Sequence, residues 1–237
     1  MPADEVDAAP LSSDDDETLA DTLSDAARSM ESQDGPHLTL VEIVVAAVEM
    51  IPGCDEGSIS VVVRKTVSSD AASGDLPRIV DAIQTEVGQG PCLDAVRLAT
   101  IVVANDLATE TRWPSFSARA AEAGAAAMMS LHLFVEGENL GALNLFARTP
   151  GAFTSESEHT GLLFASHAAI AFASAQKLAR VQVRVAAQLV IGQAEGILME
   201  RHRVTSDVAF GMLVRASQAR NMRLEAVADQ LVVEGHL

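Results

Sequence analysis

The sequence has 237 residues, a length that fits one domain of ordinary size together with a smaller one. Hydrophobic residues make up 49% of it and charged residues 21%, a composition that can bury a globular core. Two cysteines exclude a disulfide scaffold, and none of the six histidines has the HxxxH or HExxH spacing of a metal site.

The net charge of −17 is unevenly distributed. Residues 1–36 contain eleven acids and one base, residues 37–179 contain sixteen acids and eight bases, and residues 180–237 contain six acids and seven bases. An acidic protein repels phosphate polymers at long range. If the chain binds nucleic acid, its C-terminal segment must therefore carry the binding surface.

The N-terminus begins MPADEVDAAP, which is acidic and lacks the basic start of a secretory signal. The longest apolar stretch, at 162–173, is interrupted by Ser166 and His167 and is shorter than the ~20 residues that span a bilayer. We therefore expect a cytoplasmic protein that does not enter a membrane.

Residues 1–36 predict a largely disordered acidic tail, in which 19–30 have the apolar spacing of a short helix. The middle of the chain then interleaves helices and strands. In chain order the patterns predict a helix at 40–48, a strand at 59–63, a helix at 77–87, the loop GQGPC at 88–92, a strand at 101–103 and a helix at 115–123 capped by Ser115.

Two apolar stretches at 128–135 and 140–147 flank the polar segment EGEN, which predicts a β-hairpin. A helical pattern then runs from Glu156 to Val190 without Pro. This length favours a helix that pairs with a second copy of itself over two ordinary helices with a break. The stripe that would pair consists of Leu178, Val181, Val185 and Leu189.

The last segment has the pattern of a small three-helix bundle. Thr205 and Ser206 are N-cap residues for its second helix, in which Phe210 and Leu213 follow the core spacing. Asn221 can cap the third helix. With its one aromatic residue in the core, this segment is not expected to stack bases on aromatic side chains.

The segment at 191–232 resembles the ANTAR domain, a three-helix module named for antitermination. The matching pieces are IGQAEGILMER, the AF of the second helix and RASQARNMRLEAVA. The stretch before it resembles the GAF domains that accompany ANTAR in actinobacterial regulators, in GQGPCLDAV, RWPSF, LGALNLFAR and GAFTSES.

The resemblance implies an α+β fold: a GAF-like domain with a central antiparallel sheet, followed by a long helix and an all-α three-helix ANTAR-like domain. The expected divisions are an acidic, disordered tail at 1–36, a GAF-like sensor domain at 37–175, a connecting signalling helix at 176–190 and an ANTAR-like RNA-binding domain at 191–237.

The resemblance also implies that the ANTAR-like domain binds paired hairpins in nascent RNA as a homodimer and so prevents a terminator from forming. Arginine can fork onto phosphate or onto a guanine edge, and serine and asparagine can add hydrogen bonds. The candidate RNA-binding residues are Arg201, Arg203, Arg215, Ser217, Arg220, Asn221 and Arg223. In one departure, Glu195 stands where the family commonly has lysine, which replaces attraction to phosphate with repulsion.

Two other functions stay open. Glu195 and the acidic balance favour a ligand-sensing or dimerisation module that binds no nucleic acid. The segment LEAVADQLV resembles one helix of a helix-turn-helix, as in a DNA-binding regulator, but no recognition helix follows it.

The sequence lacks a nucleophile elbow, a phosphate loop and a metalloprotease helix, so we expect no catalytic residues, and it identifies no cofactor. Cys54 and Cys92 lack a basic neighbour in sequence that would lower a thiol pKa, and we expect buried structural thiols rather than a redox switch. Gly192 and Gly196 lie four apart in a helix, where each costs ~1 kcal/mol relative to alanine. Close approach of the third helix is the expected reason, and approach of RNA is the alternative.

Overall fold

The structure is a computed structural model that describes residues 13–63, 66–136 and 138–236. The chain divides into two compact units, residues 1–176 and 177–237, and one long helix contributes to both. The units are described separately below.

The first unit is built on a five-stranded antiparallel sheet with the strand order β2-β1-β5-β4-β3. Successive side chains of a strand point to opposite faces of a sheet. Met129 and Leu131 of β4 therefore join one core, and Met128 joins the core on the other face. The strands are β1 Glu56–Val63, β2 Thr66–Ala72, β3 Ile101–Ala104, β4 Ala127–Val135 and β5 Glu138–Ala147.

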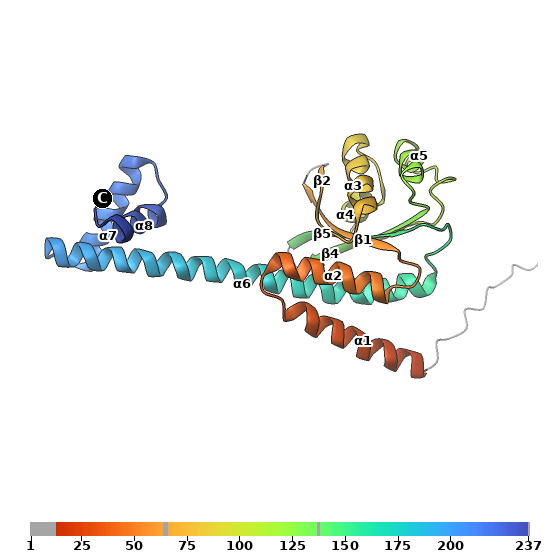
Figure 1. The fold of residues 1–237 in the computed structure, drawn as a ribbon, viewed down its shortest axis with the longest axis horizontal. Coiled ribbons are helices and arrows are strands. Elements are labelled where there is room, and N and C mark those ends of the chain that lie inside the picture. The colour runs from red at the N-terminus through yellow and green to blue at the C-terminus, as the bar shows by residue number, and fades with distance from the viewer. Residues whose placement is uncertain (1–12, 64–65, 137, 237) are drawn as a thin grey trace, which may run out of the picture. The chain divides into compact units, whose positions relative to one another are not determined.

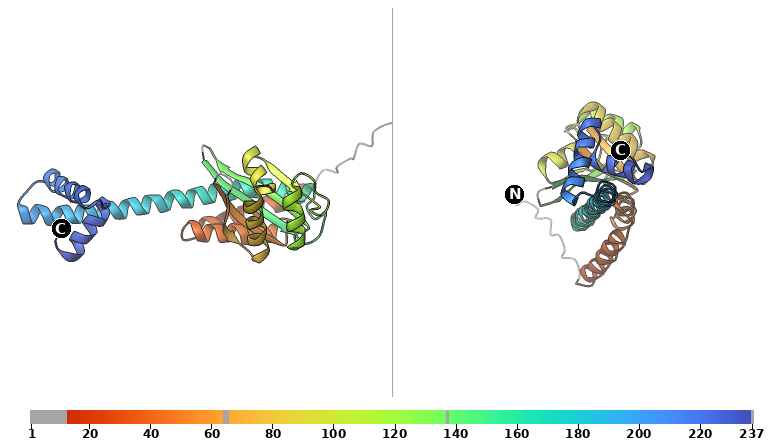
Figure 2. Two further views of the ribbon diagram at one scale, coloured as in Figure 1. Left: turned by 90° about the horizontal axis from the view of Figure 1, so that it is seen from above. Right: turned by 90° about the vertical axis from the view of Figure 1, so that its left-hand side faces the viewer.

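Helices cover both faces of this sheet (Figure 1). Helix α2, Pro36–Met50, and the first part of helix α6, Ser155–His202, lie side by side on one face (Figures 1 and 2). The other face is covered by α3, Asp75–Val87, α4, Pro91–Leu98, and α5, Pro114–Glu122. This arrangement confirms the GAF-like fold with its central antiparallel sheet.

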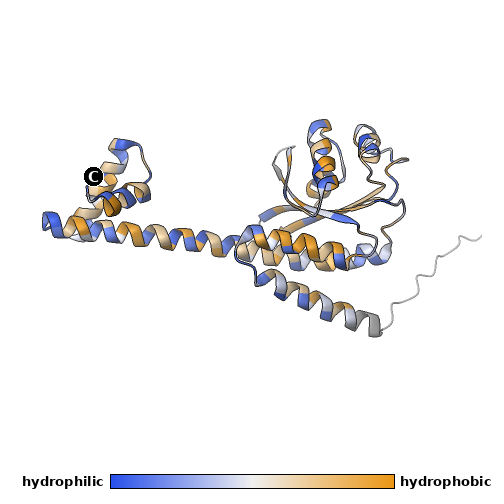
Figure 3. Ribbon diagram, viewed as in Figure 1, coloured by the Kyte–Doolittle hydropathy of each residue, from blue (hydrophilic) through white to orange (hydrophobic). Residues whose placement is uncertain are grey.

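Helix α1, Ser13–Glu31, corrects the expectation for the N-terminal segment. Leu23 and Met30 are buried in the same core as α2, and Leu19 and Ala26 pack against it. These apolar residues recur at helical spacing, so one face is buried even though the helix is far more hydrophilic than α2 (Figure 3). The short helix with apolar spacing at 19–30 is therefore present as part of a longer helix, and disorder is the wrong expectation for the rest of 13–31. Residues 1–12 of the predicted tail lie outside the described residues.

Two elements of the first unit were not predicted. Strand β2 has the sequence TVSSDAA, whose few large apolar residues suit the edge position that it takes beside β1. Helix α4 begins inside the predicted GQGPC loop, with Pro91 in its first turn, where a missing backbone N–H costs nothing. The N-cap of α5 is Trp113, so Ser115 lies within that helix and does not cap it.

The second unit contains the end of α6 together with α7, Ser206–Arg220, and α8, Leu224–Glu234. The predicted long helix and helical bundle are confirmed. The core is small and aliphatic, and Phe210 is not part of it, because this side chain lies at the flank of α7 and is 42% exposed. The fully or nearly fully buried core residues are Ala194, Leu198, Ala209, Leu213, Val227, Ala228 and Leu231.

Among the described residues, one helix, α6, is long and apolar enough to cross a membrane by length and composition. The apolar stretch at 162–173 alone does not predict this property, because Ser166 and His167 interrupt it. Phe164, Ala168 and Phe172 of this helix are buried against the sheet, as expected for a core helix of a globular domain. The length and apolar composition of α6 are thus weak evidence for a membrane span.

Candidate nucleic-acid interface and buried polar core

The seven candidate RNA-binding residues lie in three places in the second unit. Arg201 and Arg203 lie where α6 ends and α7 begins. The other end of α7 carries Arg220, and Asn221 and Arg223 follow in the turn to α8. Helix α7 has 15 residues, which at 1.5 Å per residue separates the two groups by roughly 20 Å. Arg215 and Ser217 lie on α7 near the second group.

The arginines differ in their partners. Arg220 donates from Nη1 to Oε1 of Gln230 at 2.9 Å. Arg223 lies 3.6 Å from the Glu225 carboxylate with its side chain 87% exposed, a geometry that contributes little to stability. Within the part of the chain that the structure describes, Arg201, Arg203 and Arg215 form no ion pair. These three side chains are exposed, so phosphate could reach them without breaking an internal contact.

Ser217 and Asn221 have structural tasks in the turn between α7 and α8. The hydroxyl of Ser217 donates to the carbonyl oxygen of Met222 at 2.6 Å. Asn221 has a left-handed backbone (φ 52°) and ends α7, whereas the N-cap of α8 is Arg223. Asparagine adopts this conformation more readily than most residues, so it ends a helix well. The expectation that Asn221 caps the third helix is therefore wrong.

Glu195 also has an intramolecular partner. Its Oε2 accepts a hydrogen bond from the hydroxyl of Ser206, the first residue of α7, at 2.9 Å. An acid near a helix N-terminus is stabilising. Glu195 thus links α6 to the start of α7.

Gly192 and Gly196 are exposed, and a Cβ atom built on either would have no atom within 4 Å. Close approach of the third helix, the expected reason for them, is therefore wrong. The bundle packs on the opposite side of α6, through Ala194 and Leu198, and leaves the glycine side open.

The first unit contains a buried carboxylate that sequence analysis missed. Asp81 of α3 is 1% exposed, and five side chains donate hydrogen bonds to it. Its Oδ2 accepts from the hydroxyls of Ser58 at 3.0 Å, Ser60 at 2.6 Å and Ser69 at 2.6 Å. Its Oδ1 accepts from the amides of Gln84 and Asn144, both at 3.2 Å. Burial raises the pKa of Asp81, while these bonds act in the opposite direction.

This network connects the sheet to the GQGPC loop. Oε1 of Gln84 accepts from the backbone N–H of Cys92 at 2.9 Å. Gly90 has φ 142°, and a Cβ atom there would lie 2.3 Å from Oε1 of Gln84. Glycine is therefore required at position 90 for the loop to close on Gln84. The one sequence signal for the network was the pair Ser58 and Ser60, polar residues that share a face of an otherwise apolar strand.

Both cysteines are unsuited to thiolate chemistry. Burial raises the pKa of the Cys54 thiol to about 12 and also raises the pKa of the Cys92 thiol, near which Asp81 disfavours a second negative charge. A thiol that stays protonated at neutral pH is a poor nucleophile and a poor redox sensor. Among the described residues there is no group of three or more His, Cys, Asp or Glu side chains that could hold a metal ion.

Comparisons with known proteins give the same two parts. The GAF domain family model matches residues 37–173, more than half of the chain, and the ANTAR domain model matches residues 179–232. The comparison with curated proteins gave no match.

Several solved structures are similar to the first unit. One is the chromophore-binding domain of a bacteriophytochrome from R. palustris, with 12% identity and a TM-score of 0.56. The match covers 71% of this chain and 64% of the bacteriophytochrome chain. The GAF domain of a phosphoenolpyruvate-protein phosphotransferase from Coxiella burnetii has 18% identity and a TM-score of 0.53, covering 69% and 98% of the two chains. A free methionine-R-sulfoxide reductase from Neisseria meningitidis, with its substrate, has 16% identity and a TM-score of 0.52, covering 71% and 96%. Identities this low establish the fold alone.

Proposed function

We propose that this chain is an RNA-binding regulator of transcription antitermination, because it belongs to the GAF domain family and carries an ANTAR domain after the GAF domain. In this proposal a GAF-like sensor domain at 37–175 acts through the connecting helix at 176–190 on an ANTAR-like domain at 191–237. The ANTAR-like domain binds hairpins in nascent RNA. The protein works in the cytoplasm and does not enter a membrane.

The observation that carries the proposal is the set of exposed arginines in the segment matched by the ANTAR model. Arg201, Arg203 and Arg215 lack acidic partners among the described residues, and Arg220 and Arg223 add charge near Arg215. Arginines without an internal partner keep all their donors for phosphate or a base edge. Hairpin RNA offers both, and two groups of arginines ~20 Å apart can contact separate parts of one folded RNA.

The protein acts as a homodimer through α6. Leu178, Val181, Val185 and Leu189 are 45–63% exposed and follow one another at helical spacing on a face that does not contribute to the core of the second unit. A second copy has the same stripe, so a symmetric pair would bury both. Glutamate at both Val181 and Val185 should convert the dimer to a monomer, measured by light scattering at micromolar concentration, whereas glutamate at exposed Val208 and Val233 should not.

The protein is not an enzyme. Its GAF fold is similar to that of a sulfoxide reductase, but burial raises the pKa of both thiols, which disfavours the thiolate form. The exposed arginines favour RNA binding over a sensor or dimerisation module without nucleic acid. Glu195, which favoured that alternative, is held by Ser206 within the domain.

The test is a titration of the full chain with a two-hairpin RNA and with duplex DNA of equal length. A triple variant with alanine at Arg215, Arg220 and Arg223 should bind the RNA at least tenfold more weakly, since each contact contributes ~1–3 kcal/mol. The matched control has alanine at Arg28, Arg78 and Arg97, exposed arginines of the first unit that carry the same total charge. Equal loss in both variants would indicate long-range electrostatics alone, and unchanged affinity in the first would contradict the proposed surface.

A further inference from the structure

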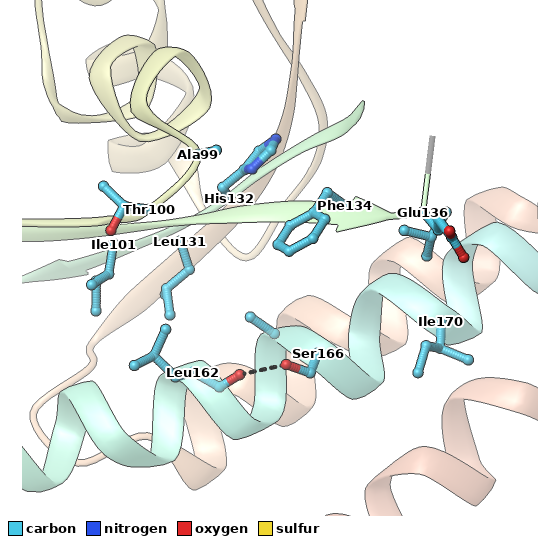
Figure 4. Close-up of a pocket in the computed structure, with 12 residues that line it drawn as sticks. Ala99, Thr100, Ile101, Leu131, His132, Phe134, Glu136, Leu162, Ser166 and Ile170 are labelled. Carbon is cyan, nitrogen blue, oxygen red and sulfur yellow. Dashed lines mark hydrogen bonds between the residues drawn. The ribbon is translucent and has the colours of Figure 1, made fainter. Parts of the chain in front are cut away.

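A pocket of about 460 Å³ lies at the edge of the sheet in the first unit, between β4 and helix α6 (Figure 4). Small-molecule sites typically have volumes of ~300–1,000 Å³. β3 ends its pairing with β4 at Leu131, but β4 continues to Val135. Among the described residues, 132–135 therefore have no neighbouring strand on that side, and His132, Phe134 and Val135 of this segment line the pocket.

The pocket has a buried apolar floor and an exposed apolar rim. Leu131 and Ala165 are 1% and 5% exposed, whereas Phe134, Leu162 and Ile170 at the rim are 59%, 49% and 56% exposed. Large apolar side chains around a concave apolar floor are unfavourable in water, so such a surface marks a binding site. The volume of about 460 Å³ between rim and floor suits a small molecule.

One wall of the pocket is held in place before any ligand arrives. The rings of His132 and Phe134 stack with their centroids 5.1 Å apart. Oδ1 of Asn139 accepts from the backbone N–H of Gly141 at 3.0 Å, so Nε2 of His132, also 3.0 Å away, must be the donor to that same oxygen. A fixed aromatic wall lowers the entropy that a ligand loses on binding.

The polar groups define the class of ligand. Glu136 is the charged residue of the lining, and no lysine or arginine is present among the described lining residues. The hydroxyl of Ser166 already donates to the carbonyl oxygen of Leu162 at 3.0 Å, so α6 offers an apolar wall. With a net charge of −17 on the chain, an anion would be repelled.

We propose that this pocket binds a mainly apolar small molecule, uncharged or cationic, whose polar group hydrogen-bonds to the free edge of β4 or to Glu136. The pocket lies at the edge of β4 next to α6, whereas the α3 face in the interior of the sheet is filled by the Asp81 network and its apolar surroundings. A ligand here contacts α6, the helix that continues into the second unit. A regulatory effect on RNA binding rests on the proposed function, but the binding itself does not.

The test uses the full chain and the uncharged fluorescent probe N-phenyl-1-naphthylamine, without RNA. One probe should bind per chain, and the anionic probe 8-anilino-1-naphthalenesulfonate should bind at least tenfold more weakly. Ile170→Asp places a charge at the rim and should weaken binding of the uncharged probe at least tenfold. Ile79→Asp, the same change at a similarly exposed position of α3 outside the pocket, should leave binding unchanged.

A second variant, and NMR mapping of the probe site on the wild-type chain, keep the test valid if Ile170→Asp misfolds. Phe134→Ala should also lose the probe, and amide resonances of 99–101, 131–136 and 162–170 in the wild-type chain should shift when the probe binds. The proposal is overturned by an absence of saturable binding, by equal losses in Ile170→Asp and Ile79→Asp, or by shifts elsewhere. It is also overturned if the probe dissociates the dimer in light scattering, because a second copy would then occupy the pocket. RNA titration of the same samples tests the proposed function separately.

Discussion

The two units of this chain place their charges and their glycines in opposite surroundings. In the first unit, Asp81 is buried under five donors, and Gly90 is a glycine because a side chain would collide with Gln84. In the second unit, Arg215 is exposed without an acidic partner among the described residues, and Gly192 faces open space. Asp81 and Gly90 of the first unit thus serve the fold, whereas Arg215 and Gly192 of the second unit are open to contact with another molecule.

The largest expected effect is on the stability of the first unit. Asp81→Ala removes the acceptor of five side-chain donors, and those that find no new partner remain buried and unsatisfied. We expect a loss of about 3 kcal/mol in the free energy of unfolding, measured by urea denaturation. Asp70→Ala, at an exposed aspartate of β2 that accepts from Ser68, should change it by less than about 1 kcal/mol. Equal changes would mean that the network does not stabilise the fold.

The glycines should respond with opposite signs. Gly90→Ala should destabilise the first unit by about 2 kcal/mol, because alanine rarely adopts the positive φ of this position and its Cβ would collide with the Gln84 side chain. Gly192→Ala has no atom in its way and should stabilise the second unit by up to ~1 kcal/mol. The same denaturation curves measure both. A destabilising Gly192→Ala that also shifts the dimer toward monomer would indicate a backbone contact between two copies.

The arginines of the second unit should differ among themselves. Arg215→Ala should weaken RNA binding roughly tenfold without changing the melting temperature, because Arg215 has no intramolecular ion pair among the described residues to lose. Arg220→Ala should weaken binding and also lower stability slightly, since it removes the bond to Gln230. Calorimetry and RNA titration on the same preparations separate the two effects. A melting temperature that falls equally in both variants would contradict the distinction.

The smallest expected effect is the pH dependence contributed by Asp81. Burial raises its pKa in the folded chain above the ordinary value of 3.8, so its contribution to stability is fully present below that value and is lost as pH rises through the folded pKa. Asp81→Asn cannot ionise and lacks this decline. The free energy of unfolding of Asp81→Asn relative to the wild type should therefore increase from about pH 4 to about pH 8. A decrease over that range would mean that the five hydrogen bonds outweigh burial.

The periodic parts of this protein could be predicted from its sequence alone. Spacings of three and four residues predicted α2, α3, the long helix and the second unit, and alternation predicted β1, because such patterns depend only on which side of one element faces a core. Two apolar stretches around a polar turn predicted the β4–β5 hairpin. The family motifs predicted both domains for the same reason that models of those families match them: they are contiguous in sequence. The candidate arginines could likewise be chosen by type and segment.

Only the tertiary structure decided where isolated polar and small residues act. Strand β2 is polar in sequence and becomes a strand through its pairing with β1. Asp81 receives its donors from β1, β2, α3 and β5, residues up to 63 positions away, which no local pattern brings together. Spacing predicts internal packing for Phe210 and Gly192. In the structure, Phe210 lies at the flank of α7, and Gly192 lies on the side of α6 that faces away from the bundle core. A sequence pattern determines the period of a helix or strand. Which side of that element its neighbours cover is decided by packing between residues that are distant in sequence.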